Sequence, residues 1–297
     1  MKRFFTDQMI ARRRRQIGAG AFTLTELLVV AGSVAMLMVA LLSVSFTTEE
    51  RVLRAQCTDN LRQIGVGWNI YQQEFNQVMP CHWKGVTYAV GGAPANPWET
   101  HEVGRVIAGT DQFSTGYDGY NTPNGPWNLA VLFATRLVPS PKIFYCPSLA
   151  RIDVQGSYDF YAAVAGIWPS VSGNPISNPG YIRVGYDYYP QLRGSNIYIG
   201  VGRFVPQAAI TPTKWTALDT KRSILTDWVY GYDTLAHRSS DLVAGLNALF
   251  PDGHVTFQNA RSNPQNFDPL QWGRAGAQTS IGNNPNYFRY IMSLWQP

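Results

Sequence analysis

The sequence has few charged residues and lacks the short motifs that mark common hydrolases and metalloenzymes. Asp, Glu, Lys and Arg make up only 14% of the 297 residues. No H-E-x-x-H, G-x-S-x-G or Cys-x-x-Cys pattern occurs in it. The sequence therefore offers no support for a hydrolase or for a motif-defined metal site, and we expect a protein that catalyses no reaction.

The chain outside its first 21 residues also lacks a net charge. The first 21 residues contain one acid, Asp7, and six basic residues: Lys2, Arg3 and the four arginines at 12–15. The rest of the chain has 18 basic and 18 acidic residues. Nucleic-acid binding requires a basic patch on the folded domain. We therefore expect no nucleic-acid partner, and we assign the net charge of +5 to a leader segment.

Cysteine is scarce, and its number limits the disulfides that can form. Cys57, Cys81 and Cys146 allow at most one internal disulfide and leave one thiol over. The sequence leaves the pairing open.

One long apolar run is present near the amino terminus, at residues 22–46, and Glu26 is its only charged residue. As a helix, these 25 residues reach roughly 37 Å, which exceeds a hydrocarbon core of about 30 Å. The basic residues all precede the run, whereas Glu49 and Glu50 follow it. The positive-inside rule then places the leader in the cytoplasm and the carboxyl-terminal body across the membrane.

Two ordinary interpretations of this segment are available. It is either a secretory signal, with a basic region at 2–15 and cleavage after Ser45, or a plain single-pass anchor. In the second case Glu26 only starts the helix, because Thr23-x-x-Glu26 fits a capping box. That local role is compatible with every interpretation.

The stretch GAFTLTELLVV at 20–30 supports a third interpretation. It resembles the class III signal of type IV prepilins and type II secretion pseudopilins. In that family a peptidase cuts before a phenylalanine on the cytoplasmic side and methylates the new amino terminus, while the apolar helix is kept. The resemblance implies processing between Ala21 and Phe22, and filament assembly through Phe22 and Glu26, the fifth residue of the mature chain. The sequence departs from the family pattern at Ala21, where Gly is usual, and near Ser43, where many relatives have a proline.

The apolar run is followed by an amphipathic pattern that predicts a continued helix at 47–75. Apolar residues recur every three or four positions, and this places them on one face. Gly65 and Gly67 interrupt the pattern and mark either close packing against the body or the point where the helix frays. Glu50 and Arg54 have the spacing of an i,i+4 ion pair. The predicted buried face consists of Leu53, Cys57, Leu61, Ile64, Trp68, Tyr71 and Phe75.

Two further stretches resemble the large pilin-like proteins of planctomycetes and verrucomicrobia. The first is CTDNLRQIGVGWNIYQQEFNQVMP at 57–80, and the second is a carboxyl-terminal His, a spaced Asn and an Asp-Gly-His-Val hairpin. FYCPS at 144–148 matches a Cys-Pro element of the same proteins. The matching carboxyl-terminal residues are His237, Gly245, Asn247, Phe250, Asp252, Gly253, His254 and Val255.

The remaining body, residues 76–297, is rich in turn-forming residues and is expected to be β-rich, without repeats or a second membrane span. We predict a short helix at 126–136, loops at 147–180, and strands at 142–146, 181–189, 196–205 and 223–230. We also predict a hairpin at 247–257 whose two-residue turn is Asp252-Gly253, with His237 close to it. Cys146 is expected to face the apolar side of the long helix, near Cys57 or Cys81.

The histidines of the body raise the question of a metal site. His82, His101, His237 and His254, together with Asp227 and Asp252, match no defined ligand motif, so no metal is assigned. Asp111 and Asp118 could bind calcium, as loops of some pseudopilins do, although their spacing matches no defined loop. No other cofactor is expected.

The fold class expected is α+β, with a long amino-terminal helix packed on an antiparallel sheet as in pilins. We divide the chain into a leader at 1–21, a membrane helix at 22–46, an amphipathic helix at 47–75 and a periplasmic body at 76–297. The resemblance implies a subunit of a pseudopilus or type IV pilus-like filament, with prepilin peptidase, other pilin-like subunits and an inner-membrane assembly platform as partners. The rival hypothesis is an exported or anchored protein that binds a glycan or metal and never polymerises.

Overall fold

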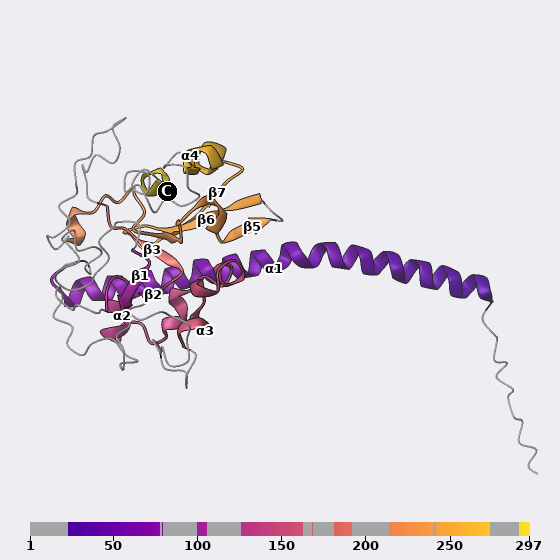
Figure 1. The fold of residues 1–297 in the computed structure, drawn as a ribbon, viewed down its shortest axis with the longest axis horizontal. Helices are drawn as coiled ribbons and strands as arrows, with labels where there is room; N and C mark the ends of the chain where they lie inside the picture. Colours follow the sequence, from indigo (N-terminus) through magenta and orange to yellow (C-terminus); the bar gives the residue numbers. More distant parts are fainter. Residues whose placement is uncertain are drawn as a thin grey trace, which may run out of the picture. The chain divides into compact units, whose positions relative to one another are not determined.

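The chain forms two compact units, Met1–Phe46 and Thr47–Pro297, and each is described by itself. The computed structural model (Figure 1) does not describe the side chains of residues 40–48, 105, 181, 271 and 273. The residues that it describes are 23–77, 79, 100–105, 126–162, 168, 181–191, 214–239, 242–273 and 291–297.

The first unit contains the start of helix α1, which spans Leu24–Glu74. The Glu26 side chain accepts a hydrogen bond from the Thr23 backbone N–H at 2.9 Å, and the Thr23 hydroxyl accepts one from the Glu26 N–H at 3.2 Å. The predicted capping box is thus confirmed. Within the described part of the chain, no helix meets the length and apolarity that a membrane crossing requires. The predicted span at 22–46 includes Phe22 and the side chains of 40–46, which lie outside the described residues.

The second unit contains the rest of α1, and the predicted apolar face of this helix is confirmed. The five central members, from Cys57 to Tyr71, are at most 3% exposed, and Leu53 and Phe75 at its ends are partly buried. Gly65 and Gly67 mark close packing rather than fraying. A Cβ on Gly65 would lie 3.2 Å from the Leu249 side chain, and one on Gly67 would lie 3.1 Å from that of Val138. These glycines let α1 approach the body on both sides.

The sheet of the second unit is antiparallel, so an α+β fold is observed. Five strands form it, and a separate pair, β1 (Glu102–Arg105) and β2 (Tyr181–Arg183), forms a small ribbon. Figure 1 shows the second half of α1 between this sheet and the short helices α2 and α3. The five strands are β3 (Tyr186–Tyr188), β4 (Leu225–Asp227), β5 (His237–Ser239), β6 (Leu242–Leu249) and β7 (Val255–Asn259).

Strand β6 is the centre of the sheet because three strands pair with it. β7 follows one edge from Gly245 to Leu249. On the other edge, β4 pairs with Ala248 and Leu249, and β5 pairs with the beginning of β6 up to Gly245. Asn247 therefore lies where β4 ends and β5 has not yet begun. Its backbone N–H has no strand partner on that edge and needs another acceptor.

The two faces of the sheet bury separate cores. Leu249 and Leu225 belong to the core that includes the buried face of α1, whereas Leu246 and Ala248 belong to a second core. This division follows from the alternation of side chains along β6. The second core also contains Phe267, Trp272 and Trp295, from the carboxyl-terminal segments around α4 (Pro269–Gly273).

Several local predictions are wrong in their bounds or type. Segment 142–146 is not a strand, because Pro141 and the Ser140 cap start the 3-10 helix η2 (Pro141–Phe144). The helix predicted at 126–136 is confined to α2 (Ala130–Ala134), since Asn128 has a φ of 50° and breaks the helical path.

The strand predicted at 181–189 divides into β2 and β3, which pair with different strands. Gly185 lies at the division, where a Cβ would come within 2.6 Å of the Cys146 backbone N. The strand predicted at 223–230 is limited to β4. Part of the region predicted as loops is helical. It contains the 3-10 helices η3 (Leu149–Arg151) and η4 (Val154–Gly156) and the helix α3 (Tyr158–Tyr161).

The predicted hairpin is confirmed as β6 and β7, but its turn is longer than two residues. Gly253 N–H donates to the Phe250 carbonyl at 2.9 Å, and Phe250 N–H donates to the His254 carbonyl at 3.0 Å. Pro251 and Asp252 therefore occupy the centre of a four-residue turn, which suits a proline in its second position. Gly253, with a φ of 90°, completes the loop in the left-handed region.

We expect Gly245→Ala to destabilise the body much more than Gly253→Ala. Gly245 has a φ of 151°, and a Cβ there would lie 2.1 Å from the Gln258 carbonyl oxygen, so the loss should be about 2–6 kcal/mol. At Gly253 a Cβ meets only Asn69, at 3.5 Å, and the loss should be about 1–2 kcal/mol from the positive φ alone. Denaturant unfolding of the full chain in detergent, followed by tryptophan fluorescence, measures both. Equal losses would contradict the close contact at Gly245.

Candidate functional site

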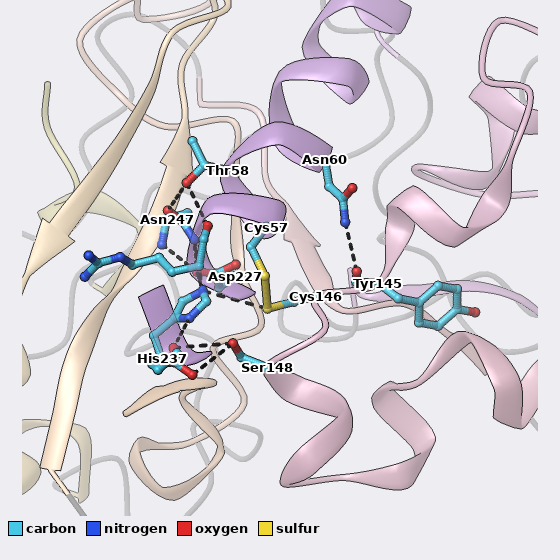
Figure 2. Close-up of a disulfide and its surroundings, with 11 residues drawn as sticks. Cys57, Thr58, Asn60, Tyr145, Cys146, Ser148, Asp227, His237 and Asn247 are labelled. Carbon is cyan, nitrogen blue, oxygen red and sulfur yellow. Dashed lines mark hydrogen bonds and ion pairs between the residues drawn. A yellow bond between two sulfur atoms is a disulfide. The ribbon is translucent and has the colours of Figure 1, made fainter. Parts of the chain in front are cut away.

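A disulfide between Cys57 and Cys146 joins α1 to the segment that follows η2 (Figure 2). The two Cα atoms are 5.2 Å apart, and both side chains are fully buried. Cys57 is on the apolar face of α1 because of its helical spacing from Leu61. Nearby, the Asn60 side chain donates a hydrogen bond to the Tyr145 carbonyl at 3.1 Å. The long helix is thus tied to this segment by a covalent bond and by a hydrogen bond.

His237, the first residue of β5, lies beside the disulfide and between two carboxylates. Its Nδ1 is 2.7 Å from Glu50 Oε1 of α1, and its Nε2 is 3.2 Å from Asp227 Oδ2 of β4. Nε2 is also 3.8 Å from the Cys146 sulfur. The histidine and Asp227 are fully buried, whereas the Glu50 side chain is 20% exposed. One imidazole therefore contacts the helix, the sheet and the disulfide.

The charge of His237 depends on two opposing effects. Burial lowers its pKa, but the carboxylates of Asp227 and Glu50 outweigh this and raise the pKa from 6.5 to about 9. At neutral pH the ring is therefore an imidazolium that donates one N–H to Glu50 and the other to Asp227. When it loses its proton, Nε2 can accept from Asn247 Nδ2, which lies 2.9 Å away.

Asn247 connects this cluster to the centre of the sheet. Its backbone N–H donates to Asp227 Oδ2 at 2.5 Å, and its side-chain Nδ2 donates to the same oxygen at 3.1 Å. The Asp227 carboxylate thus takes the place of the carbonyl of a neighbouring strand, which is missing beside Asn247 on this edge of β6. The Thr58 hydroxyl of α1 lies 2.9 Å from Asn247 Oδ1. Each polar group of Asn247 that faces α1 or β4 is therefore matched.

The cluster also contains atoms that can bind a metal ion. Cys57, Cys146, Asp227 and His237 each offer one ligand atom, and these four atoms lie within 4.8 Å of one another. All four residues are buried. This is the only such group found in the described part of the chain.

The other predicted site residues are not brought into this cluster. His101 is buried beside Asp187, with Nδ1 3.3 Å from Oδ1. His254 lies at the hairpin tip, where it pairs with Asp252 and stacks on Phe250. His237 contacts the body of the hairpin, at Asn247 and Phe257, rather than its tip. Ala21, Phe22, Cys81, His82, Asp111, Asp118 and the strand predicted at 196–205 lie outside the described residues.

The sequence interpretation missed Glu50 as a member of the site. We predicted a pair with Arg54, but Glu50 binds His237 and accepts from the Ser148 hydroxyl at 3.3 Å. The Arg54 guanidinium instead lies over the Phe257 ring, 4.3 Å from its centroid. The neighbouring acid, Glu49, pairs with Arg151. Both acids that follow the apolar run therefore contact residues that are distant in sequence. Helical spacing alone cannot indicate partners of this kind.

No protein-family model, no curated protein and no solved structure matches the chain.

We expect the stability of the oxidised, metal-free chain to fall as the pH rises from about 6.5 through about 9. The folded pKa of His237 lies above its usual value of 6.5, so its stabilisation is complete below pH 6.5 and is lost above the folded pKa. The loss should be on the order of 3 kcal/mol. Denaturant unfolding at a series of pH values, with a chelator present, measures it.

The matched variants for this test are His237→Gln, which removes the titration, and His254→Gln, which changes an exposed histidine at the hairpin tip. The first should flatten the pH profile, and the second should leave it as in the wild type. A wild-type profile in His237→Gln would show that another group is responsible.

Proposed function

We propose that the chain is a subunit of a pilin-like filament, made as a precursor and held in the inner membrane with its body in the periplasm. The observation that carries this proposal is the start of α1, which combines an apolar surface with a single carboxylate. All described side chains from Thr23 to Val39 are exposed. An apolar surface of this extent needs lipid or another protein to cover it.

The exposed surface surrounds the helix rather than forming one stripe. The large apolar side chains there are at least 42% exposed. A helix that is apolar all round is suited to a bilayer or to the interior of a helical bundle. A pilin-like subunit would have its helix in the bilayer before assembly and in a helical bundle within the filament. The side chains are Leu24, Leu27, Leu28, Val29, Val30, Val34, Met36, Leu37, Met38 and Val39.

Glu26 is the feature that favours a filament over a plain anchor. A carboxylate in a membrane helix costs about 2.5–3.5 kcal/mol at the centre and less near the end. The Glu26 carboxylate accepts a hydrogen bond from the Thr23 N–H. Thr23 would be the second residue of the mature chain if cleavage occurs before Phe22. In a filament, the Phe22 ammonium of a neighbouring subunit would supply a partner of opposite charge.

The second unit supports the same proposal through its architecture. A helix with one face against an antiparallel sheet is what the resemblance implied, and the disulfide suits an oxidising compartment. The partners would be prepilin peptidase, other pilin-like subunits and an inner-membrane assembly platform. The filament would act in protein secretion or at the cell surface.

We expect the mature protein to lack its first 21 residues and to gain one methyl group on Phe22. Intact mass and amino-terminal sequencing of the chain purified from membranes measure both. Deletion of the prepilin peptidase gene should leave the full-length precursor. Loss of 45 residues would instead identify a secretory signal. If the chain stays uncut although the peptidase is present, the plain-anchor interpretation would be correct.

We expect Glu26→Gln to reduce incorporation into sheared filaments at least tenfold, with membrane insertion and cleavage nearly unchanged. Glutamine keeps an acceptor for the Thr23 N–H but removes the charge that would pair with the neighbour's ammonium. The matched control is Thr23→Ala, which removes the hydroxyl of the capping box and keeps the charge. Equal incorporation of Glu26→Gln and the wild type would reduce Glu26 to a residue that starts the helix.

A further inference from the structure

The four potential ligand atoms of the site come from four separate segments of the chain. Cys57 is on α1, Cys146 follows η2, Asp227 ends β4 and His237 begins β5. Figure 2 shows their side chains converging at the disulfide. Residues so distant in sequence meet here only because the second unit folds.

We propose that, when Cys57 and Cys146 are in the dithiol form, this cluster is a zinc site with two thiolates, one imidazole and one carboxylate. The same two cysteines would then link α1 to the body in one of two mutually exclusive forms. One is the disulfide, and the other is a divalent cation. The inference does not depend on the proposed filament function.

The distances suit a tetrahedral ion. Zinc bonds of about 2.3 Å to sulfur and 2.0–2.2 Å to nitrogen or oxygen place neighbouring ligand atoms roughly 3.3–3.8 Å apart. His237 Nε2 already lies 3.8 Å from the Cys146 sulfur, and the four ligand atoms lie within 4.8 Å of one another. The two sulfurs, bonded in the disulfide, would have to separate by rotation of the cysteine side chains, whose Cα atoms are 5.2 Å apart.

The surrounding contacts hold the ligands as metal sites require. Glu50 Oε1, 2.7 Å from His237 Nδ1, fixes the ring so that Nε2 faces the Cys146 sulfur. A carboxylate on the far nitrogen is the usual second partner of a zinc-bound histidine. Asn247 holds Asp227 through its backbone N–H and its amide.

One atom of the cluster is not explained by the disulfide form. Asp227 Oδ1 is buried and has no hydrogen-bond partner among the described residues. A buried carboxylate oxygen without a partner is costly. Coordination of a cation through Oδ1 would supply the missing interaction and leave Oδ2 with its bonds to Asn247.

The two forms interconvert by a balanced exchange. A dithiol reductant transfers two electrons and two protons to the Cys57–Cys146 bond and becomes a disulfide itself. Zn²⁺ then binds as the two thiols, and His237 if protonated, release their protons. Oxidation reverses this: two electrons pass from the thiolates to a protein disulfide, which takes up two protons to become a dithiol, while the Cys57–Cys146 bond forms again and Zn²⁺ is released.

Cobalt binding to the full chain in detergent tests the proposal, with Cys81→Ser as the background so that only two thiols remain. The chain is reduced with a phosphine, freed of reductant without air and titrated with Co²⁺. We expect one Co²⁺ per chain, with the thiolate charge-transfer band and the visible bands of a four-coordinate site, and displacement by Zn²⁺. The oxidised chain, which has the same sequence, should bind none.

Three variants separate this site from simple chelation by two thiols. Glu50→Gln should weaken binding about 10–100-fold, because it keeps an acceptor for Nδ1–H but removes the negative charge that makes the imidazole a stronger ligand. His237→Ala should change the visible bands, whereas His254→Ala, at the exposed hairpin tip, should not. The proposal is overturned if the reduced chain binds no Co²⁺, if the oxidised chain binds it equally, or if Glu50→Gln and His237→Ala both bind as the background chain does.

Discussion

The second unit depends on one buried charge interaction, the imidazolium of His237 between the carboxylates of Glu50 and Asp227. Burial alone would lower the pKa of the ring, and the two carboxylates outweigh that effect and keep it charged. Glu50 belongs to the helix and Asp227 to the sheet, while the ring also touches the disulfide sulfur of Cys146. Removing either acid would leave a buried charge with half of its compensation.

The Asp227 carboxylate also accepts hydrogen bonds from the central strand of the sheet. β6 exchanges β4 for β5 along one edge, and the exchange leaves the Asn247 N–H without a strand partner. Asp227 accepts that N–H and the Asn247 amide while it faces His237. The Asp227 side chain therefore links the pairing of the strands to the packing of α1 on the sheet. This gives the spaced His and Asn of the carboxyl-terminal motif a structural reason.

Two patterns local in sequence predicted their elements well, other local patterns gave wrong bounds or types, and contacts between distant residues were not predicted. The 3–4 spacing around Cys57 predicted the buried face of α1, and the Asp-Gly pair predicted the hairpin, because each signal lies within one element. Glu50 was assigned to Arg54, its helical neighbour, since nothing local indicates a histidine 187 residues away. The sequence left the cysteine pairing open for the same reason. The proposed filament function rests on resemblance and on the exposed apolar surface.

The bond between Cys57 and Cys146 also determines how the molecule would bear a mechanical load. These residues are 89 positions apart in sequence, yet the covalent path between them is a single cystine. If tension were applied to α1 and to the sheet strands that follow Cys146, it would pass across this bond. The intervening segment, with the rest of α1 and helix α2, would be outside the load path. The chain with the disulfide intact could therefore be stretched without extending that segment, whereas the chain with this bond reduced would lengthen through it.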